Sequence, residues 1–134
     1  MPFETPLVLD DAFAQRIAAA FSIGGHQAGW GFSAESWAGM LPHQSIVVPL
    51  NPAAIVSWHS SFLPFSMALA APDGSGAALF GQDEFGLVAG EPGVVETFLG
   101  STISDARKAF AAYADDMNGA ARHLAEVASR YGRR

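Results

Sequence analysis

The chain has 134 residues, enough for one folded domain with its own core, and half of them are apolar, which excludes a disordered chain. It contains no cysteine, so disulfides, thiolate metal sites and a cysteine nucleophile are excluded as well. The formal net charge is −6, and no lysine or arginine occurs between Arg16 and Arg107. Because a surface without cations cannot neutralise phosphates, we expect neither nucleic acid nor a membrane as a partner.

Two further features of the sequence bear on partners and location. Only 15% of the residues are charged, below the usual quarter, so part of the surface should be covered by a protein partner or by a second copy of the chain. No cationic leader opens the sequence, and its apolar stretches are interrupted well short of a membrane span. The expected location is therefore the cytoplasm.

The first predicted element is an amphipathic helix near the N-terminus. Asp10 and Asp11 supply an N-terminal cap, and Phe13, Ile17 and Phe21 recur at four-residue spacing on what should be its buried face. Two glycines at positions 24 and 25 end it. The segment that follows, 24–32, is rich in glycine and is predicted to be a loop, followed by a short helical turn over 33–40.

The middle of the chain is predicted to form an antiparallel sheet. Short runs rich in β-branched and aromatic residues alternate with turn residues, and the segment 72–76 has the composition of a hairpin turn. Consecutive short strands with tight turns favour antiparallel pairing. The predicted strands cover residues 44–50, 54–60, 65–71, 77–81 and 85–89, which gives a sheet of four or five strands.

The C-terminal part is predicted to be helical. A short helix should run from Pro92 to Leu99, and a stripe of apolar residues then continues at three- and four-residue spacing from Ile103 to Tyr131. One long amphipathic helix explains this stripe, although Asn118–Gly119 is a weak point at which the helix would bend back onto its own domain. An unbroken helix would overhang the sheet, and we expect its free part to pair with a second copy through Phe110, Tyr113, Met117, Leu124, Val127 and Tyr131.

Several motifs suggest chemistry but lack the necessary context. The glycines at 24–31 follow no strand and precede no lysine, so a phosphate-binding loop is not predicted. Histidines 26, 43 and 59 do not have metal-ligand spacing, so we predict no metal and no cofactor. Ser57 and His59 would share a strand face, but no nucleophile elbow frames a serine. The acidic pair at 83–84 is expected to lie solvated in a turn.

Aromatic residues offer the best candidate for a binding site. The segment 58–65 is aromatic and ends beside a proline, and such a segment is costly to leave in water. Together with the glycine-rich loop it would form a site for a ligand or partner. The residues that we expect to line this site are His26, Trp30, Trp58, His59 and Phe62.

Taken together, these patterns predict a single α+β domain spanning residues 1–134: an N-terminal helix, a central antiparallel sheet, a short helix and a long C-terminal helix. The cations cluster near the C-terminus, where they complement a helix dipole or pair with the acidic body of a second subunit. The function we expect is that of a non-catalytic protein-interaction module, such as an adaptor, immunity-like or regulatory protein, dimeric through the C-terminal helix. The alternative is a small enzyme or ligand-binding domain with an aromatic and histidine-lined pocket.

Overall fold

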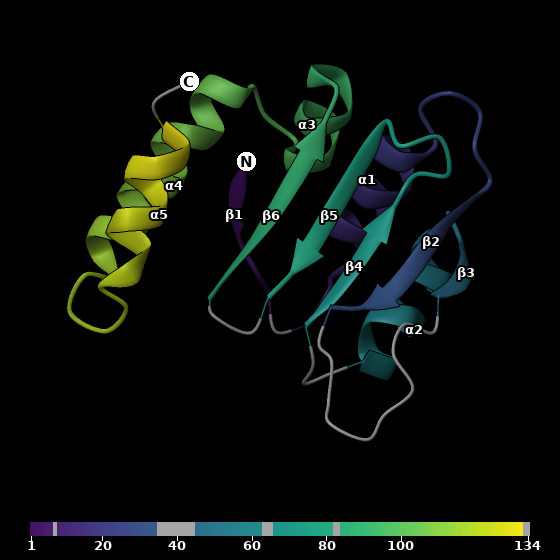
Figure 1. Cartoon of the computed structure of the whole chain (residues 1–134), viewed down its shortest axis with the longest axis horizontal. Coiled ribbons are helices and arrows are strands. Elements are labelled where there is room, and N and C mark those ends of the chain that lie inside the picture. The colour runs from purple at the N-terminus through teal and green to yellow at the C-terminus, as the bar shows by residue number, and fades with distance from the viewer. Residues whose placement is uncertain (7, 35–44, 63–65, 82–83, 133–134) are drawn as a thin grey trace.

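The computed structural model describes residues 1–6, 8–34, 45–62, 66–81 and 84–132, and these form a mixed α+β fold (Figure 1). Its six-stranded antiparallel sheet has the order β1-β6-β5-β4-β2-β3. The strands are β1 (Pro2–Glu4), β2 (Ala28–Ser33), β3 (Ser45–Pro49), β4 (Met67–Ala70), β5 (Gly76–Phe80) and β6 (Phe85–Gly90). The helices are α1 (Asp11–Phe21), α2 (Pro52–Phe62), α3 (Pro92–Leu99), α4 (Ile103–Asp116) and α5 (His123–Gly132).

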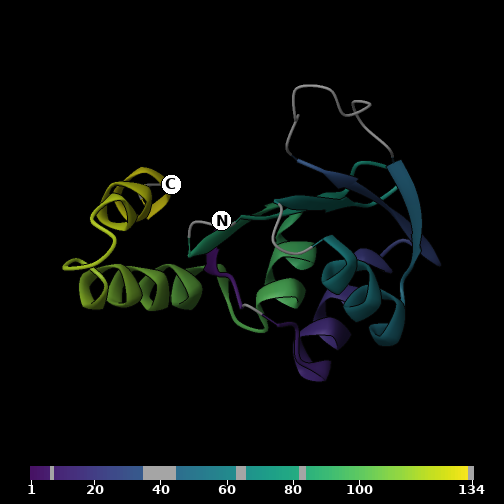
Figure 2. The same cartoon turned by 90° about the horizontal axis from the view of Figure 1, so that it is seen from below.

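The sheet separates two unlike sides of the molecule. Helices α1, α2 and α3 lie against one face of it, and α4 and α5 lie beyond its β1 edge (Figure 2). The prediction of an antiparallel sheet is confirmed, but the sheet has six strands rather than four or five. A strand also precedes the N-terminal helix, since β1 pairs with β6 and places the Phe3 ring over Gly86.

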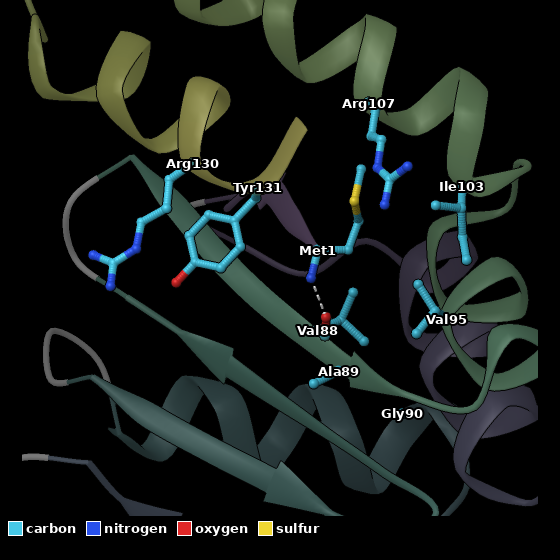
Figure 3. A pocket seen from close by; sticks show the side chains of 9 residues that line it. All are labelled: Met1, Val88, Ala89, Gly90, Val95, Ile103, Arg107, Arg130 and Tyr131. Carbon is cyan, nitrogen blue, oxygen red and sulfur yellow. Dashed lines mark hydrogen bonds between the residues drawn. The ribbon is translucent and has the colours of Figure 1, made fainter. Parts of the chain in front are cut away.

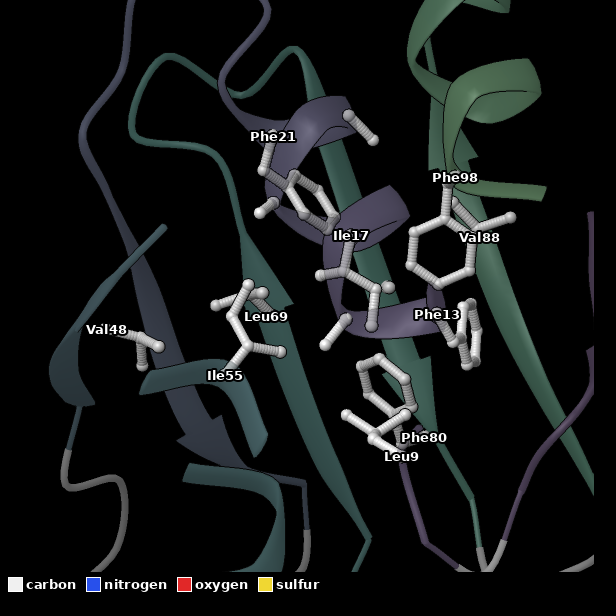
Figure 4. Packing of buried hydrophobic residues seen from close by; sticks show 14 of the residues in the cluster. Leu9, Phe13, Ile17, Phe21, Val48, Ile55, Leu69, Phe80, Val88 and Phe98 are labelled. Atoms are coloured by element: carbon white, nitrogen blue, oxygen red, sulfur yellow. The ribbon is translucent and has the colours of Figure 1, made fainter. Parts of the chain in front are cut away.

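Helix α1 is formed as its sequence pattern predicts. The Asp10 carboxylate accepts a hydrogen bond from the Phe13 main-chain nitrogen at 2.6 Å, which caps the first turn. Phe13, Ile17 and Phe21 are all buried against the sheet. Edge-to-face ring pairs join this helix to α3 and β1: the centroid of the Phe13 ring lies 5.4 Å from that of Phe98 (Figure 4) and 5.9 Å from that of Phe3. Each such ring contributes about 1.5–3 kcal/mol of hydrophobic stabilisation.

The prediction of a strand over 54–60 is wrong, because this segment lies within helix α2. The Asn51 side chain accepts from the Ala54 main-chain nitrogen at 2.9 Å, and Pro52 occupies the first turn, where its missing N–H costs nothing. Ile55, Trp58 and His59 then fall on one helical face and are almost fully buried. The Asn–Pro start signal outweighs the β propensity of the isoleucine and valine that follow it.

The glycine-rich segment predicted to be a loop instead contains β2, in which glycines alternate with larger residues. Gly31 faces the helices, and a Cβ atom there would lie 2.5 Å from Nε1 of Trp58, so only glycine admits the indole this close to the sheet. The neighbouring Trp30 therefore points to the opposite face. Most of the helical turn predicted over 33–40 lies outside the described residues; Ser33 itself ends β2.

The single long C-terminal helix is also a wrong prediction, since the stripe is divided between α4 and α5. Helix α4 ends at Asp116, and the chain turns through Asn118 and Gly119 before α5 begins. The two helices lie side by side (Figures 1 and 2) and bury Phe110, Ala114, Ala121 and Leu124 in a second small core. The alternative of a chain that bends at Gly119 thus describes the structure better.

Candidate interaction surface

The sheet face turned away from α1, α2 and α3 carries two rows of side chains, which the strand register defines. Both rows cross the sheet from β3 to β6. One begins at Val47 and continues with Trp30 on β2, and the other begins at Ser45 and continues with Phe32 on β2. We call the side chains of both rows the open face: Trp30, Phe32, Ser45, Val47, Ala68, Ala70, Ala77, Leu79, Leu87 and Ala89.

The open face contains no charged side chain, and on the same side of the sheet the register of the described strands adds one acid, Glu4, in the neighbouring row at the β1 edge. Trp30 is 43% exposed and Val47 is 61% exposed, so its largest aromatic and its edge valine are both accessible. An antiparallel sheet with one solvated face normally alternates apolar inward residues with polar outward ones, and this sheet does not. A contiguous apolar area of this kind is typical of a protein-binding surface.

The two edges of the sheet differ in how they are covered. The β1 edge is short, and α4 and α5 pack beside it (Figure 2). The β3 edge is longer, and no described strand lies beyond it. The Leu50 main-chain nitrogen donates to the Gln27 carbonyl at 2.9 Å. Because hydrogen-bonded pairs alternate along an antiparallel ladder, the main-chain groups of Val48 and Ile46 also bond to β2.

The main-chain groups of Ser45 and Val47 consequently point outward from the sheet. Strand β3 carries no charged residue, whereas natural edge strands are usually protected by lysine, by a bulge or by a covering element. Its one protective residue is Pro49, which removes an outward N–H at the end of the strand. The edge therefore presents bonding groups able to pair with another strand.

The structure does not gather the residues predicted to line an aromatic pocket. Trp30 is on the open face, whereas Trp58 and His59 are buried on the opposite side of the sheet. The His59 ring packs edge-to-face on Phe80 at 5.6 Å, its Nδ1 has no hydrogen-bond partner, and burial lowers its pKa. His59 is thus a core residue and is not placed to exchange protons with a ligand.

His26, another residue of the predicted pocket, has a structural contact of its own. Its Nε2 lies 2.9 Å from the Asp73 carboxylate and joins the loop after α1 to the β4–β5 turn. Hydrogen bonds from Ser75, and then from His26, hold the pKa of Asp73 well below its usual range. The side chain of Phe62 lies outside the described part, and three cavities bordered by described residues are lined by none of the five candidates.

Most residues of the C-terminal stripe are used inside the protein. Phe110 and Leu124 are buried between α4 and α5, and Tyr113, Met117 and Val127 pack partly against them. Tyr131 remains 36% exposed at the end of α5. As an interface between copies, this set stays a prediction.

The hairpin formed by α4 and α5 also contacts Glu84, the residue before β6. The Tyr113 hydroxyl donates to the Glu84 carbonyl at 3.1 Å, and His123 Nε2 lies 3.5 Å from the Glu84 carboxylate. Burial raises the pKa of the Tyr113 hydroxyl, as do the nearby carboxylates of Glu4 and Glu84. Glu84 has a positive φ of 58°, so these contacts stabilise a backbone conformation that is unfavourable for a residue with a side chain.

The structure does not bring together Ser57 and His59, the pair considered for nucleophilic catalysis. Ser57 is exposed and His59 is buried, and two residues apart on a helix they do not face each other. No group of three histidines or acids in the described ranges is arranged to hold a metal ion. Among the helices that the structure describes, none is long and apolar enough to cross a membrane.

In comparisons with known proteins, no family model, no curated protein and no solved structure matches this chain.

The sequence did contain a signal for the open face that a search for turn residues misses. In the segment Ala28–Ser33, Gly29 and Gly31 alternate with Ala28, Trp30 and Phe32. Such alternation is a strand pattern in which one face carries no side chains. The uncharged edge at Ser45–Pro49 was predicted as a strand, but its place at the edge depends on pairing that no local pattern specifies.

Proposed function

We propose that the chain is a non-catalytic protein-interaction module that self-associates through the β3 edge. The observation that carries this proposal is that β3 is an uncharged edge strand whose Ser45 and Val47 main-chain groups face outward. An extended strand adds readily to such an edge, and main-chain hydrogen bonds then supply much of the affinity.

The register of β3 specifies how a second copy would pair. A twofold axis perpendicular to the sheet at Ile46 places Ser45 opposite the partner's Val47, and Val47 opposite the partner's Ser45. Every outward N–H and C=O of these two residues is then bonded. The pairing joins both sheets into one and brings the two open faces together on the same side.

A second copy suits this edge better than a charged partner does. The chain as a whole carries a net charge of −6, so two copies would repel each other if they met through their acidic surfaces. Self-association therefore needs a contact surface without charges. At β3 and on the open face, neither copy contributes a charge to the contact. In the paired form the exposed Val47 side chain would lose part of its contact with water, and this apolar burial adds to the main-chain hydrogen bonds.

The mass of the protein in solution tests the proposal. Sedimentation equilibrium at micromolar concentrations should give twice the monomer mass of 14.0 kDa. Val47→Lys places a charge on the edge and should raise the dissociation constant about tenfold or more. Val8→Lys is the matched control, because Val8 is 69% exposed and lies outside the sheet. A monomeric wild type, or equal effects of the two lysines, would contradict the proposal.

A further inference from the structure

A cavity of about 530 Å³ lies where β6 meets the C-terminal helices. Its floor is formed by Val88, Ala89 and Gly90, and side chains from α3, α4 and the end of α5 form its walls (Figure 3). Met1 lies across it and donates a hydrogen bond from its nitrogen to the Val88 carbonyl. The volume is within the range of small-molecule sites.

Two arginines and the N-terminal ammonium of Met1 give this cavity a positive charge. Arg107 descends from α4 beside Met1, and Arg130 lies on the opposite side with its guanidinium directed away from Arg107 (Figure 3). None of the nine lining residues is acidic. Nε of Arg107 is buried without a hydrogen-bond partner, and neither arginine forms an ion pair with another described residue.

Arg16 also has a buried Nε without a hydrogen-bond partner, but Glu4 and Asp10 line the cavity beside it, whereas the cavity beside Arg107 has no carboxylate in its lining. The chain has 13 acidic residues against 7 basic ones, so carboxylates are abundant, yet none lines this cavity. Burying part of a charged group without a partner costs free energy, and a ligand that supplies the missing acceptor recovers that cost. The position of Arg107 therefore indicates an anionic ligand.

We propose that this cavity binds a small organic acid with an apolar body. Its carboxylate would accept hydrogen bonds from the Arg107 guanidinium, whose planar fork matches two carboxylate oxygens. Its apolar part would contact Met1 and Ile103, with the Tyr131 ring on the α5 side. Arg130 adds positive charge at the rim.

The lining favours this ligand over a phosphate or a polyanion. The lining is part apolar and part polar, and only one of the two guanidinium groups points inward. A multiply charged ligand would find only the Arg107 guanidinium and the Met1 ammonium, which already donates to the Val88 carbonyl, and the acidic remainder of the chain would repel it. The cavity adjoins the β1 side of the sheet, at the far end from β3, so it does not depend on self-association.

A titration followed by amide NMR spectra tests this assignment with octanoate as the probe. Saturable shifts are expected at Val88, Ala89 and Ile103 with a dissociation constant in the millimolar range. Octanol shares the chain but has no charge, and acetate has the charge but no chain; both should bind about tenfold more weakly or worse. A short peptide ending in leucine, compared with its C-terminal amide, tells whether a protein C-terminus is an equally good source of the carboxylate.

Two variants separate the role of Arg107 from general charge. Arg107→Gln should weaken octanoate binding about tenfold and leave octanol binding unchanged. Lys108→Gln removes the same charge one residue away, from a side chain that is 76% exposed and 3.4 Å from Asp105, and should have no effect.

Equal binding of octanol and octanoate to the wild type would overturn the proposal, and so would the absence of shifts with octanoate. This comparison of ligands needs no variant and therefore holds even where Arg107→Gln fails to fold. Where that variant does fold, unchanged octanoate affinity would likewise overturn the proposal.

Discussion

The indole of Trp58 packs against Gly31, at a distance that leaves no room for a side chain on the strand. A Cβ atom at Gly31 would lie 2.5 Å from Nε1 of Trp58 and 2.8 Å from a methyl of Val48. Helix α2 is thereby seated on the β2–β3 end of the sheet, next to the edge that we propose for self-association. The position of that edge depends on this contact.

Replacing Gly31 by alanine should therefore destabilise the protein by about 1–3 kcal/mol, because the tryptophan or the strand must move. Urea unfolding followed by tryptophan fluorescence measures the loss. Gly93→Ala is the control, since nothing lies within 4 Å of a Cβ there, and it should be neutral or slightly stabilising. Equal effects of the two substitutions would contradict the close packing.

The buried His59 predicts a pH dependence of stability. Burial lowers its pKa below the ordinary value of 6.5, so between the folded-state pKa and 6.5 the unfolded chain binds a proton that the folded chain does not. The free energy of unfolding should thus be highest above pH 6.5 and fall as the pH is lowered through that range. His59→Phe should flatten this slope, whereas His123→Gln, at an exposed position, should preserve it.

The hydrogen bond from Tyr113 to Glu84 predicts a smaller and local effect. Tyr113→Phe removes the donor and should cost about 0.5–1.5 kcal/mol. Amide exchange should accelerate first at Glu84 and Phe85, where the hairpin of α4 and α5 contacts the start of β6. Tyr131→Phe serves as the control, because no hydrogen bond of its hydroxyl to another described residue is present.

Substitution of Leu124 distinguishes a role of the C-terminal helices in internal packing from a role in an interface between two copies. It is fully buried between α4 and α5, so Leu124→Ala should lower the free energy of unfolding by about 2–5 kcal/mol. The sedimentation mass at temperatures where the variant is folded should stay that of the wild type. A conversion to monomer without loss of stability would instead support dimerisation through the stripe.

Local signals in the sequence predicted part of the fold and missed the rest for identifiable reasons. The cap at Asp10 and the proline at Pro92 marked α1 and α3 correctly. The heptad stripe kept its phase across Gly119, yet the chain turns there, since two short helices bury the stripe against each other without a partner.

The alternation in β2 indicates one uncovered face, but local sequence patterns do not specify which strands lie beside it or which strand forms the edge. The open face and the β3 edge arise from the strand order β5-β4-β2-β3, in which β2 lies between two strands that follow it in the chain. Arg107 was counted among the cations of a helix, and only its tertiary surroundings place it beside a cavity. A residue on a helix surface gives no sign of what the rest of the chain brings to it.

Self-association through β3 is tested most directly by a cysteine at Ile46. The chain has no cysteine of its own, and Ile46 is 39% exposed on the edge strand. In the proposed pairing Ile46 faces its own copy in a non-hydrogen-bonded pair, where the two Cα atoms are about 4.5 Å apart, within reach of a disulfide. Mild oxidation of Ile46→Cys should give a covalent dimer of twice 14.0 kDa, while Val8→Cys stays monomeric. An Ile46→Cys protein that remains at 14.0 kDa under the same oxidation would contradict the account.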